Sequence, residues 1–163
     1  MELYGFKVKV VFFVCNDEVL AYGWHYEKKK AIKHLEKILE FHELENGEIK
    51  SSVQLENWLK TEIKGVVERG LSFKLPPEVH YKNRLVYENI IKIPKGSTMT
   101  YAQIAKISGI KYTELLITLM RNPFQVLIPC HRLLTNKGSL MGFYPLGKEV
   151  KRRLLEVEKK INP

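Results

Sequence analysis

A cysteine followed directly by a histidine stands in the apolar segment Ile128-Pro129-Cys130-His131-Arg132. The thiolate, not the thiol, is the nucleophile, so a catalytic cysteine needs a base that takes its proton. Pro129 fixes its own backbone angle φ, and the apolar run 126–128 ahead of it is typical of a short buried strand. The sequence therefore predicts a reactive Cys130 at a strand end, with His131 as the candidate base.

Adjacency alone does not establish this chemistry, because neighbouring side chains on an extended segment point to opposite faces. The alternative for Cys130 is a buried structural thiol, which is a common fate of free cysteine. The second cysteine, Cys15, lies in a strand-like pattern and is interpreted as such a core residue.

A carboxylate that could orient His131 occurs in the last predicted helix, residues 148–160. The apolar stripe of this helix consists of Val150, Leu154, Val157 and Ile161. Glu158 follows Leu154 by four residues, so it lies beside the stripe, where a buried carboxylate needs a partner such as an imidazole. Cys130, His131 and Glu158 would then be nucleophile, base and orienting group. The alternative for Glu158 is a surface carboxylate paired with nearby lysines.

The segment before residue 78 is expected to form an α/β domain. We predict strands over residues 4–14 and 19–25, a helix over 27–45 that ends at Asn46-Gly47, and a short strand over 71–75. Ser51 or Ser52 caps a further helix that stops at Gly70. Pro76-Pro77 breaks the chain, so the expected domains are residues 1–77 and 78–163.

The segment after residue 77 is expected to be mostly helical. We predict helices over 78–91, from Thr100 to 108 and over 112–121, a hairpin turn at 136–138 and the last helix. Thr100 with Gln103 is a capping box, and Gly109 turns the chain between two short helices, which makes a helix-turn-helix of winged type. The second of these helices is expected to bury Leu115, Leu116, Leu119 and Met120.

Charge is distributed unevenly between the two segments. Residues 1–78 contain 12 Lys and Arg against 13 Asp and Glu, whereas residues 79–163 contain 15 against 5. All of the excess positive charge lies in the half with Cys130, which favours a nucleic-acid surface there over a merely solvated basic face.

Composition limits the remaining possibilities. A hydrophobic content of 45% and a charged content of 28% are those of an ordinary globular protein. No apolar run approaches the roughly 18 residues of a membrane helix, no secretory signal is recognised, and two cysteines make no disulfide framework. We therefore expect a cytoplasmic protein without a membrane partner. Metal binding is not expected, because Cys15, His25, His34 and His80 lack paired spacing.

The order of motifs from about residue 81 to 158 closely resembles the O6-alkylguanine-DNA alkyltransferases. The resemblance rests on Asn122-Pro123, the segment 128–132, Gly142-Phe143-Tyr144, and an upstream Pro94-Lys95-Gly96 with Tyr101-Ala102-Gln103-Ile104-Ala105. It implies a ribonuclease-H-like roll for the N-terminal domain. It also implies irreversible, stoichiometric transfer of an alkyl group from O6-methylguanine, and from O4-methylthymine, to Cys130, without a cofactor.

The resemblance also implies roles for individual residues. His131 would deprotonate the thiol through a bridging water, Asn122 would brace the cysteine turn, and Tyr101 would hydrogen-bond the extruded guanine. The substrate and DNA contacts that it implies are Tyr144, Gly142, Leu133, Arg121, Lys111 and Lys106. The protein is expected to be a monomer. Its expected partner is double-stranded DNA that carries alkylated guanine, bound in the minor groove without regard to sequence.

Three positions depart from the family pattern. Glu114 stands where the family has an arginine that fills the gap left by the extruded base, and Pro145 replaces a residue whose N–H faces the guanine oxygen. A glycine often present between Arg121 and Asn122 is missing. Two other functions stay open: a winged-helix regulator that senses alkylation or oxidation at Cys130, and a Cys-His acyl hydrolase.

Overall fold

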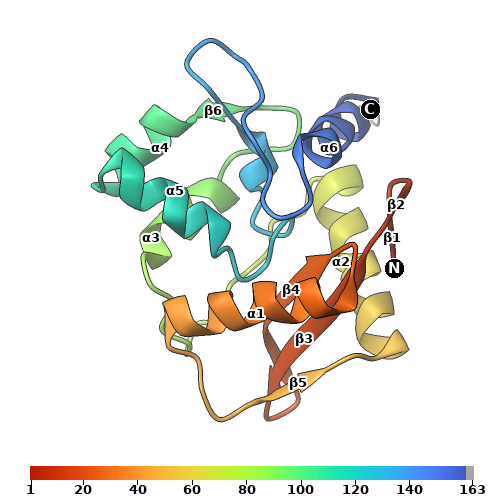
Figure 1. Cartoon of the computed structure of the whole chain (residues 1–163). Helices are drawn as coiled ribbons and strands as arrows, with labels where there is room; N and C mark the ends of the chain where they lie inside the picture. Colours follow the sequence, from red (N-terminus) through yellow and green to blue (C-terminus); the bar gives the residue numbers. More distant parts are fainter. Residues whose placement is uncertain (161–163) are drawn as a thin grey trace.

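The computed structural model describes residues 1–160, and its N-terminal half is a small antiparallel sheet between two helices (Figure 1). The strands are β1 (Glu2–Leu3), β2 (Phe6–Lys7), β3 (Lys9–Cys15), β4 (Glu18–His25) and β5 (Glu48–Lys50), and the helices are α1 (Lys28–His42) and α2 (Val53–Arg69). The main sheet has the order β4-β3-β5, and β1 pairs with β2.

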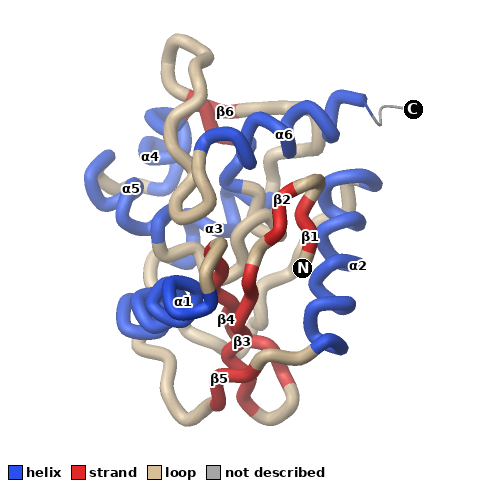
Figure 2. Tube along the Cα trace, turned by 45° about the vertical axis from the view of Figure 1, so that its right-hand side comes forward, coloured by secondary structure: helices blue, strands red, loops and turns tan. Residues whose placement is uncertain are grey.

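Alternation along β3 places a helix on each face of the sheet, as Figure 2 shows. Val11 and Phe13 pack with the α1 residues Ala31, Leu35 and Ile38. Val10, Phe12 and Val14 belong to the larger core, which includes Leu59, Ile63, Val66 and Val67 of α2. Successive side chains of a strand point to opposite faces, so this one strand supplies both layers.

Several predicted features of this half are confirmed. The hairpin β3–β4 is present, the Ser52 side chain accepts from the Leu55 N–H to cap α2, and Gly70 ends α2 at φ 69°. Four details are wrong. The strand predicted over residues 4–14 is interrupted, because Tyr4 and Gly5 form a turn at positive φ and β3 begins only at Lys9. Helix α1 ends at His42, because Glu43 takes the left-handed conformation. Residues 71–75 form no strand, and the third strand is instead β5, an exposed edge segment.

The C-terminal half contains most of the helices. They are α3 (Arg84–Ile91), α4 (Tyr101–Ser108), α5 (Tyr112–Met120) and α6 (Lys148–Lys160), with the 3₁₀ turn η1 (Cys130–Arg132). Strands β6 (Met99–Thr100) and β7 (Leu133–Leu134) pair in parallel. The capping box of Thr100 and Gln103 is confirmed, as are the glycine turn at Gly109, with φ 69°, and the predicted bounds of α6.

Two predictions for this half are wrong. Helix α3 begins at Arg84 rather than residue 78, because the chain before it forms turns, and the carbonyls of Pro76 and Val79 accept from the Arg84 guanidinium. The run 126–128 is a turn rather than a strand. Val126 has φ 80°, a conformation that a β-branched side chain rarely adopts, and the Ile128 N–H donates back to Phe124 O at 2.8 Å.

The two halves share one interior. The Trp24 indole N–H donates to Gln125 Oε1 at 2.6 Å, and the Tyr22 N–H donates to Pro123 O at 3.0 Å. The segment 123–125 thereby covers the outer edge of β4. Buried residues from Leu3 to Val157 form a single apolar cluster. Within residues 1–160, no helix combines the length and apolar character needed to cross a membrane.

Candidate active site

Cys130 begins the turn η1 and is nearly buried, with 6% of its surface exposed. The Asn122 side chain makes three hydrogen bonds to this turn and the segment before it. Its Nδ2 donates to Ile128 O at 3.1 Å and to Cys130 Sγ at 3.4 Å, and its Oδ1 accepts from the Phe124 N–H at 2.9 Å. Burial raises the pKa of the Cys130 thiol, against the opposing effects of the Asn122 hydrogen bond and the Lys151 charge. The resting cysteine is therefore a thiol that needs a base.

His131 is completely buried and contacts Glu158 on α6, with 3.1 Å between His131 Nε2 and Glu158 Oε2. Burial lowers the pKa of His131, although Glu158 opposes this effect, so the ring is neutral at neutral pH. Burial alone would raise the pKa of Glu158, but His131 and Arg132 together hold it below its usual value. An ionised carboxylate only accepts, so the ring proton lies on Nε2.

The other ring nitrogen of His131 is left with a free lone pair. Nδ1 is buried and has no hydrogen-bond partner among the described residues. A neutral imidazole with one nitrogen held by a carboxylate and the other unpartnered is arranged to accept a proton. Of the predicted triad, the structure thus brings His131 and Glu158 into contact, and Cys130 directly precedes His131 in η1.

Arg132 completes the group around Glu158, and sequence reasoning gave it no role. Its guanidinium donates to both carboxylate oxygens, with Nε at 3.0 Å and Nη2 at 2.5 Å from Oε2. It also donates to the backbone carbonyls of Ile93 at 2.7 Å and Val66 at 3.2 Å. Arg132 is 3% exposed, so this is a buried pair with its hydrogen bonds satisfied on both sides.

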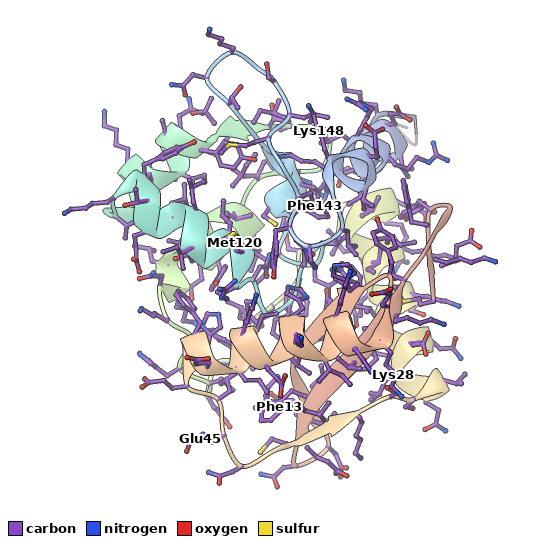
Figure 3. The ribbon with its side chains drawn as sticks, viewed as in Figure 1. Phe13, Lys28, Glu45, Met120, Phe143 and Lys148 are labelled. Carbon is purple, nitrogen blue, oxygen red and sulfur yellow. The ribbon has the colours of Figure 1, made fainter. Side chains whose placement is uncertain are left out.

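Cys130 opens onto an apolar pocket of about 220 Å³. The lining residues are Tyr101, Leu116, Leu119, Met120, Gln125, Cys130, Met141, Gly142, Phe143 and Tyr144. Figure 3 shows Met120 and Phe143 approaching this region from α5 and from the loop before α6. Of the α5 residues predicted to be buried, only Leu115 is; Met120 is 36% exposed, because it lines the pocket with Leu116 and Leu119.

Tyr101 and Lys151 form a second polar pair at the pocket. Lys151 is buried on α6, and its Nζ donates to the Tyr101 hydroxyl at 2.5 Å. Burial lowers the pKa of Lys151 to about 8 and raises that of Tyr101. Because the ammonium occupies a lone pair of the phenol oxygen, the phenol proton remains available to a group in the pocket. Lys151 and Glu158 are seven residues apart on one helix face, so the reasoning that identified Glu158 applied equally to Lys151.

Gln125 connects the pocket to the N-terminal half. Its Oε1 accepts from Trp24, its backbone carbonyl accepts from the Tyr22 hydroxyl, and its Nε2 donates to Tyr144 O at 2.6 Å. Gln125 also lowers the pKa of Cys130 through its side chain. No local pattern indicated Gln125, because its partners Tyr22 and Trp24 lie about 100 residues earlier.

The remaining predicted residues lie at and around the pocket. Gly142 and Tyr144 line it, and a Cβ atom built on Gly142 would meet no atom within 4 Å. Leu133 is fully buried in β7, whereas Lys106 and Lys111 are exposed and Arg121 is half-buried. Among residues 1–160, no three His, Cys, Asp or Glu side chains gather closely enough to hold a metal ion.

The Glu114 side chain is held within the protein. Its Oε1 accepts from Asn83 Nδ2 at 3.0 Å, so the carboxylate faces the start of α3. Tyr112 in the first turn of α5 is 43% exposed, and its hydroxyl lies 3.8 Å from Sδ of the pocket residue Met141.

Residues 82–160 match a known family, described as the 6-O-methylguanine DNA methyltransferase, DNA binding domain. Proteins named methylated-DNA–protein-cysteine methyltransferase are 41% identical to this chain over 75 residues in Methanothermobacter thermautotrophicus and over 73 residues in Saccharolobus solfataricus. These segments cover 46% and 45% of this chain, and 42% and 47% of the respective relatives. The matched region therefore spans less than half of each relative.

Solved structures give two further likenesses. An O6-methylguanine-DNA methyltransferase from Pyrococcus kodakaraensis aligns over 93% of this chain and 91% of its own, with a TM-score of 0.62 and 22% identity. The Mycobacterium tuberculosis protein OGT, solved in complex with DNA, aligns over 64% of this chain and 66% of its own, with a TM-score of 0.53 and 27% identity. The first extends the shared fold, a mixture of helices and small sheets, through both halves.

Proposed function

We propose that this protein repairs DNA by transferring an alkyl group to Cys130, because residues 82–160 match the family described as the 6-O-methylguanine DNA methyltransferase, DNA binding domain. The substrate is O6-methylguanine, and O4-methylthymine is a second candidate. The observation that carries the proposal is a buried thiol at a pocket, beside a neutral histidine whose Nδ1 is unpartnered and whose Nε2 is held by Glu158.

The reaction is a displacement at the alkyl carbon. The thiol proton passes to His131 Nδ1 through a bridging water, and the sulfur forms a bond to carbon as the carbon–oxygen bond breaks. Guanine leaves with the electron pair, and the proton gained by His131 balances that negative charge. The Tyr101 phenol, whose oxygen accepts from Lys151, donates to the leaving base. Since no residue here reverses a thioether, each molecule acts once, and no cofactor takes part.

The DNA contacts follow from the elements around the pocket. The target base lies inside a duplex, so it must be extruded to reach Cys130. Helices α4 and α5 with the loop after β7 would act as a winged helix-turn-helix in the minor groove. Lys106, Lys111 and Arg121 would contact phosphates without reading sequence. Tyr112, planar and exposed beside the pocket, would take the gap that Glu114 cannot fill.

The two domains of the protein would be residues 1–77 and residues 78–163. The first would be a ribonuclease-H-like roll that supports the pocket through Trp24 and Gln125. Pro145 offers no N–H to the guanine oxygen, so that contact would come from elsewhere. The protein would act as a monomer in the cytoplasm, where a reducing environment keeps Cys130 free.

The test uses duplex DNA that carries O6-methylguanine with a labelled methyl group. Label should appear on the protein, saturate at one per chain, and map to Cys130. Cys130→Ala should bind duplex DNA as before and take up no label, because alanine has no nucleophile. Label on the alanine variant would overturn the proposal. DNA binding with no transfer by the wild-type protein would favour the sensor function instead.

A further inference from the structure

Helix α1 carries lysines where the helix itself disfavours them. Lys28, Lys29 and Lys30 form its first turn, and Lys33 and Lys37 follow, all exposed. The N-terminus of a helix has a partial positive charge that favours acidic residues. Here the first turn contains no acidic residue, and Glu27 at the N-cap makes no side-chain cap. The lysines destabilise the helix that bears them, so folding does not explain their presence.

The positive charge of the N-terminal half is concentrated on this helix. Residues 28–37 hold five lysines and one glutamate, whereas the other positions of residues 1–78 hold seven basic and twelve acidic residues. Lys30 pairs with Glu27 at 3.2 Å, but neither Lys33 nor Lys37 has an ion pair with a carboxylate in the described part of the chain. The near-neutral total for this half therefore conceals one strongly basic face.

This basic face reaches the mouth of the pocket through Lys37. Lys30, Lys33 and Lys37 follow helical spacing on one side of α1. Lys37 Nζ lies 3.5 Å from the Tyr144 hydroxyl and 5.9 Å from the centre of its ring, and the His34 ring packs edge-on against Tyr144 at 5.6 Å. Tyr144 lines the pocket and is 38% exposed. Figure 3 shows α1 crossing below Met120 and Phe143, with Lys28 at its far end.

We propose that Lys30, Lys33 and Lys37 bind the sugar–phosphate backbone of the DNA duplex beside the extruded nucleotide. This inference rests on the proposed function, because the occupant is the duplex whose base enters the pocket. The three lysines span seven residues of helix, about 10 Å, which equals about three base steps of one strand. The surface therefore extends the contact made by α4 and α5 onto the N-terminal half. It requires no base contact, which suits a lesion that occurs in any sequence.

The experiment compares Lys33→Ala/Lys37→Ala with Lys60→Ala/Lys64→Ala. Lys60 and Lys64 have the same spacing and are exposed on α2, on the opposite side of the sheet (Figure 2). Binding to unmodified duplex DNA is measured from 0.05 to 0.5 M salt, together with transfer from O6-methylguanine duplex and from the free alkylated base. Melting temperatures establish that every variant is folded.

The Lys33/Lys37 variant should bind duplex DNA with a log–log salt slope that is shallower by about two. At 0.1 M salt, each lost phosphate contact corresponds to about eightfold weaker binding. Transfer from limiting duplex should slow in parallel, whereas transfer from the free base and the behaviour of the Lys60/Lys64 variant should not change. Equal slopes for the two double variants would overturn the inference while leaving the proposed function intact. Absence of transfer by the wild-type protein would overturn the proposed function, and the slopes would still decide the role of α1.

Discussion

Buried histidines occur in two regions of this molecule, and the regions use them differently. In α1, His34 Nδ1 accepts from the Trp24 N–H at 3.0 Å. His42 donates from Nε2 to Arg121 O at 2.8 Å and accepts at Nδ1 from the Lys82 N–H at 3.0 Å. Backbone groups thus hold both of these rings in place. Beside Cys130, His131 has a carboxylate on one nitrogen and an unpartnered lone pair on the other.

The comparison shows that burial does not make a histidine a base. Burial lowers the pKa of His34 to about 3 and that of His42 to about 4, and it also lowers the pKa of His131. All three rings are therefore neutral at neutral pH. What distinguishes His131 is an ionised partner that stabilises the ring once it is protonated, and a free nitrogen that can accept the proton.

The largest expected effect is a difference in alkyl-transfer rate between variants of His131 and variants of His42. His131→Gln should reduce the single-turnover rate of alkyl transfer by roughly 10²–10⁴-fold, the usual loss on removal of a positioned base. His42→Gln should transfer at nearly the wild-type rate, since its ring lies between backbone groups. Quenched-flow measurements at pH 7.5 with excess protein test both. A His131→Gln variant as fast as His42→Gln would erase the distinction.

The buried pair behind His131 should dominate stability. Arg132→Met leaves the Glu158 carboxylate buried with His131 as its remaining partner, which should destabilise the fold by about 3–5 kcal/mol. Arg152 lies on α6, the helix that carries Glu158, and pairs with Glu149 at the surface. Arg152→Met should therefore change stability by less than about 1 kcal/mol. Urea unfolding measures both. Similar losses would mean that the Arg132 contact contributes no more than a surface pair.

The two neutral histidines of α1 should make the folded protein less stable in acid. Their pKa values in the folded protein, about 3 and about 4, lie below the unfolded value of about 6.5. The unfolded chain then binds protons that the folded chain does not, so stability is full above pH 6.5 and falls as pH decreases. Each residue should cost about 2 kcal/mol between pH 7.5 and pH 5. Urea unfolding of wild-type protein and His34→Gln should show a smaller pH loss in the variant; parallel losses would contradict the assignment.

The smallest expected effect concerns the packing around Cys130. A methyl group added to a thiol that is 6% exposed is an overpacking change, which should cost about 1–3 kcal/mol. Thermal melting should therefore shift down after reaction with methylated duplex, and not after incubation with unmodified duplex. Hydrogen exchange should increase in η1 and α6 but not in α1. A melting temperature that stays constant would show that the pocket accommodates the methyl group without strain.

Local chemistry determined much of this protein from its sequence. The Ser52 and Thr100 caps, the turn at Gly109 and the bounds of α6 all depend on residues within a few positions of one another. The position of Glu158 beside the α6 stripe follows from the same short-range periodicity. The motif at 128–132 identified Cys130 and His131 as candidates, because residue types can be read from the sequence whereas the surroundings of a side chain cannot.

Tertiary structure alone decided the remainder. The left-handed Val126 turn is held by Asn122 and Gln125, and Gln125 is held by Trp24, about 100 residues away. Strand β5 has three exposed residues and exists only because β3 offers a free edge. Lys37 reaches Tyr144 across 107 positions. Propensity and periodicity act over one or two turns of chain, whereas such contacts form only when the shared apolar core brings distant segments together.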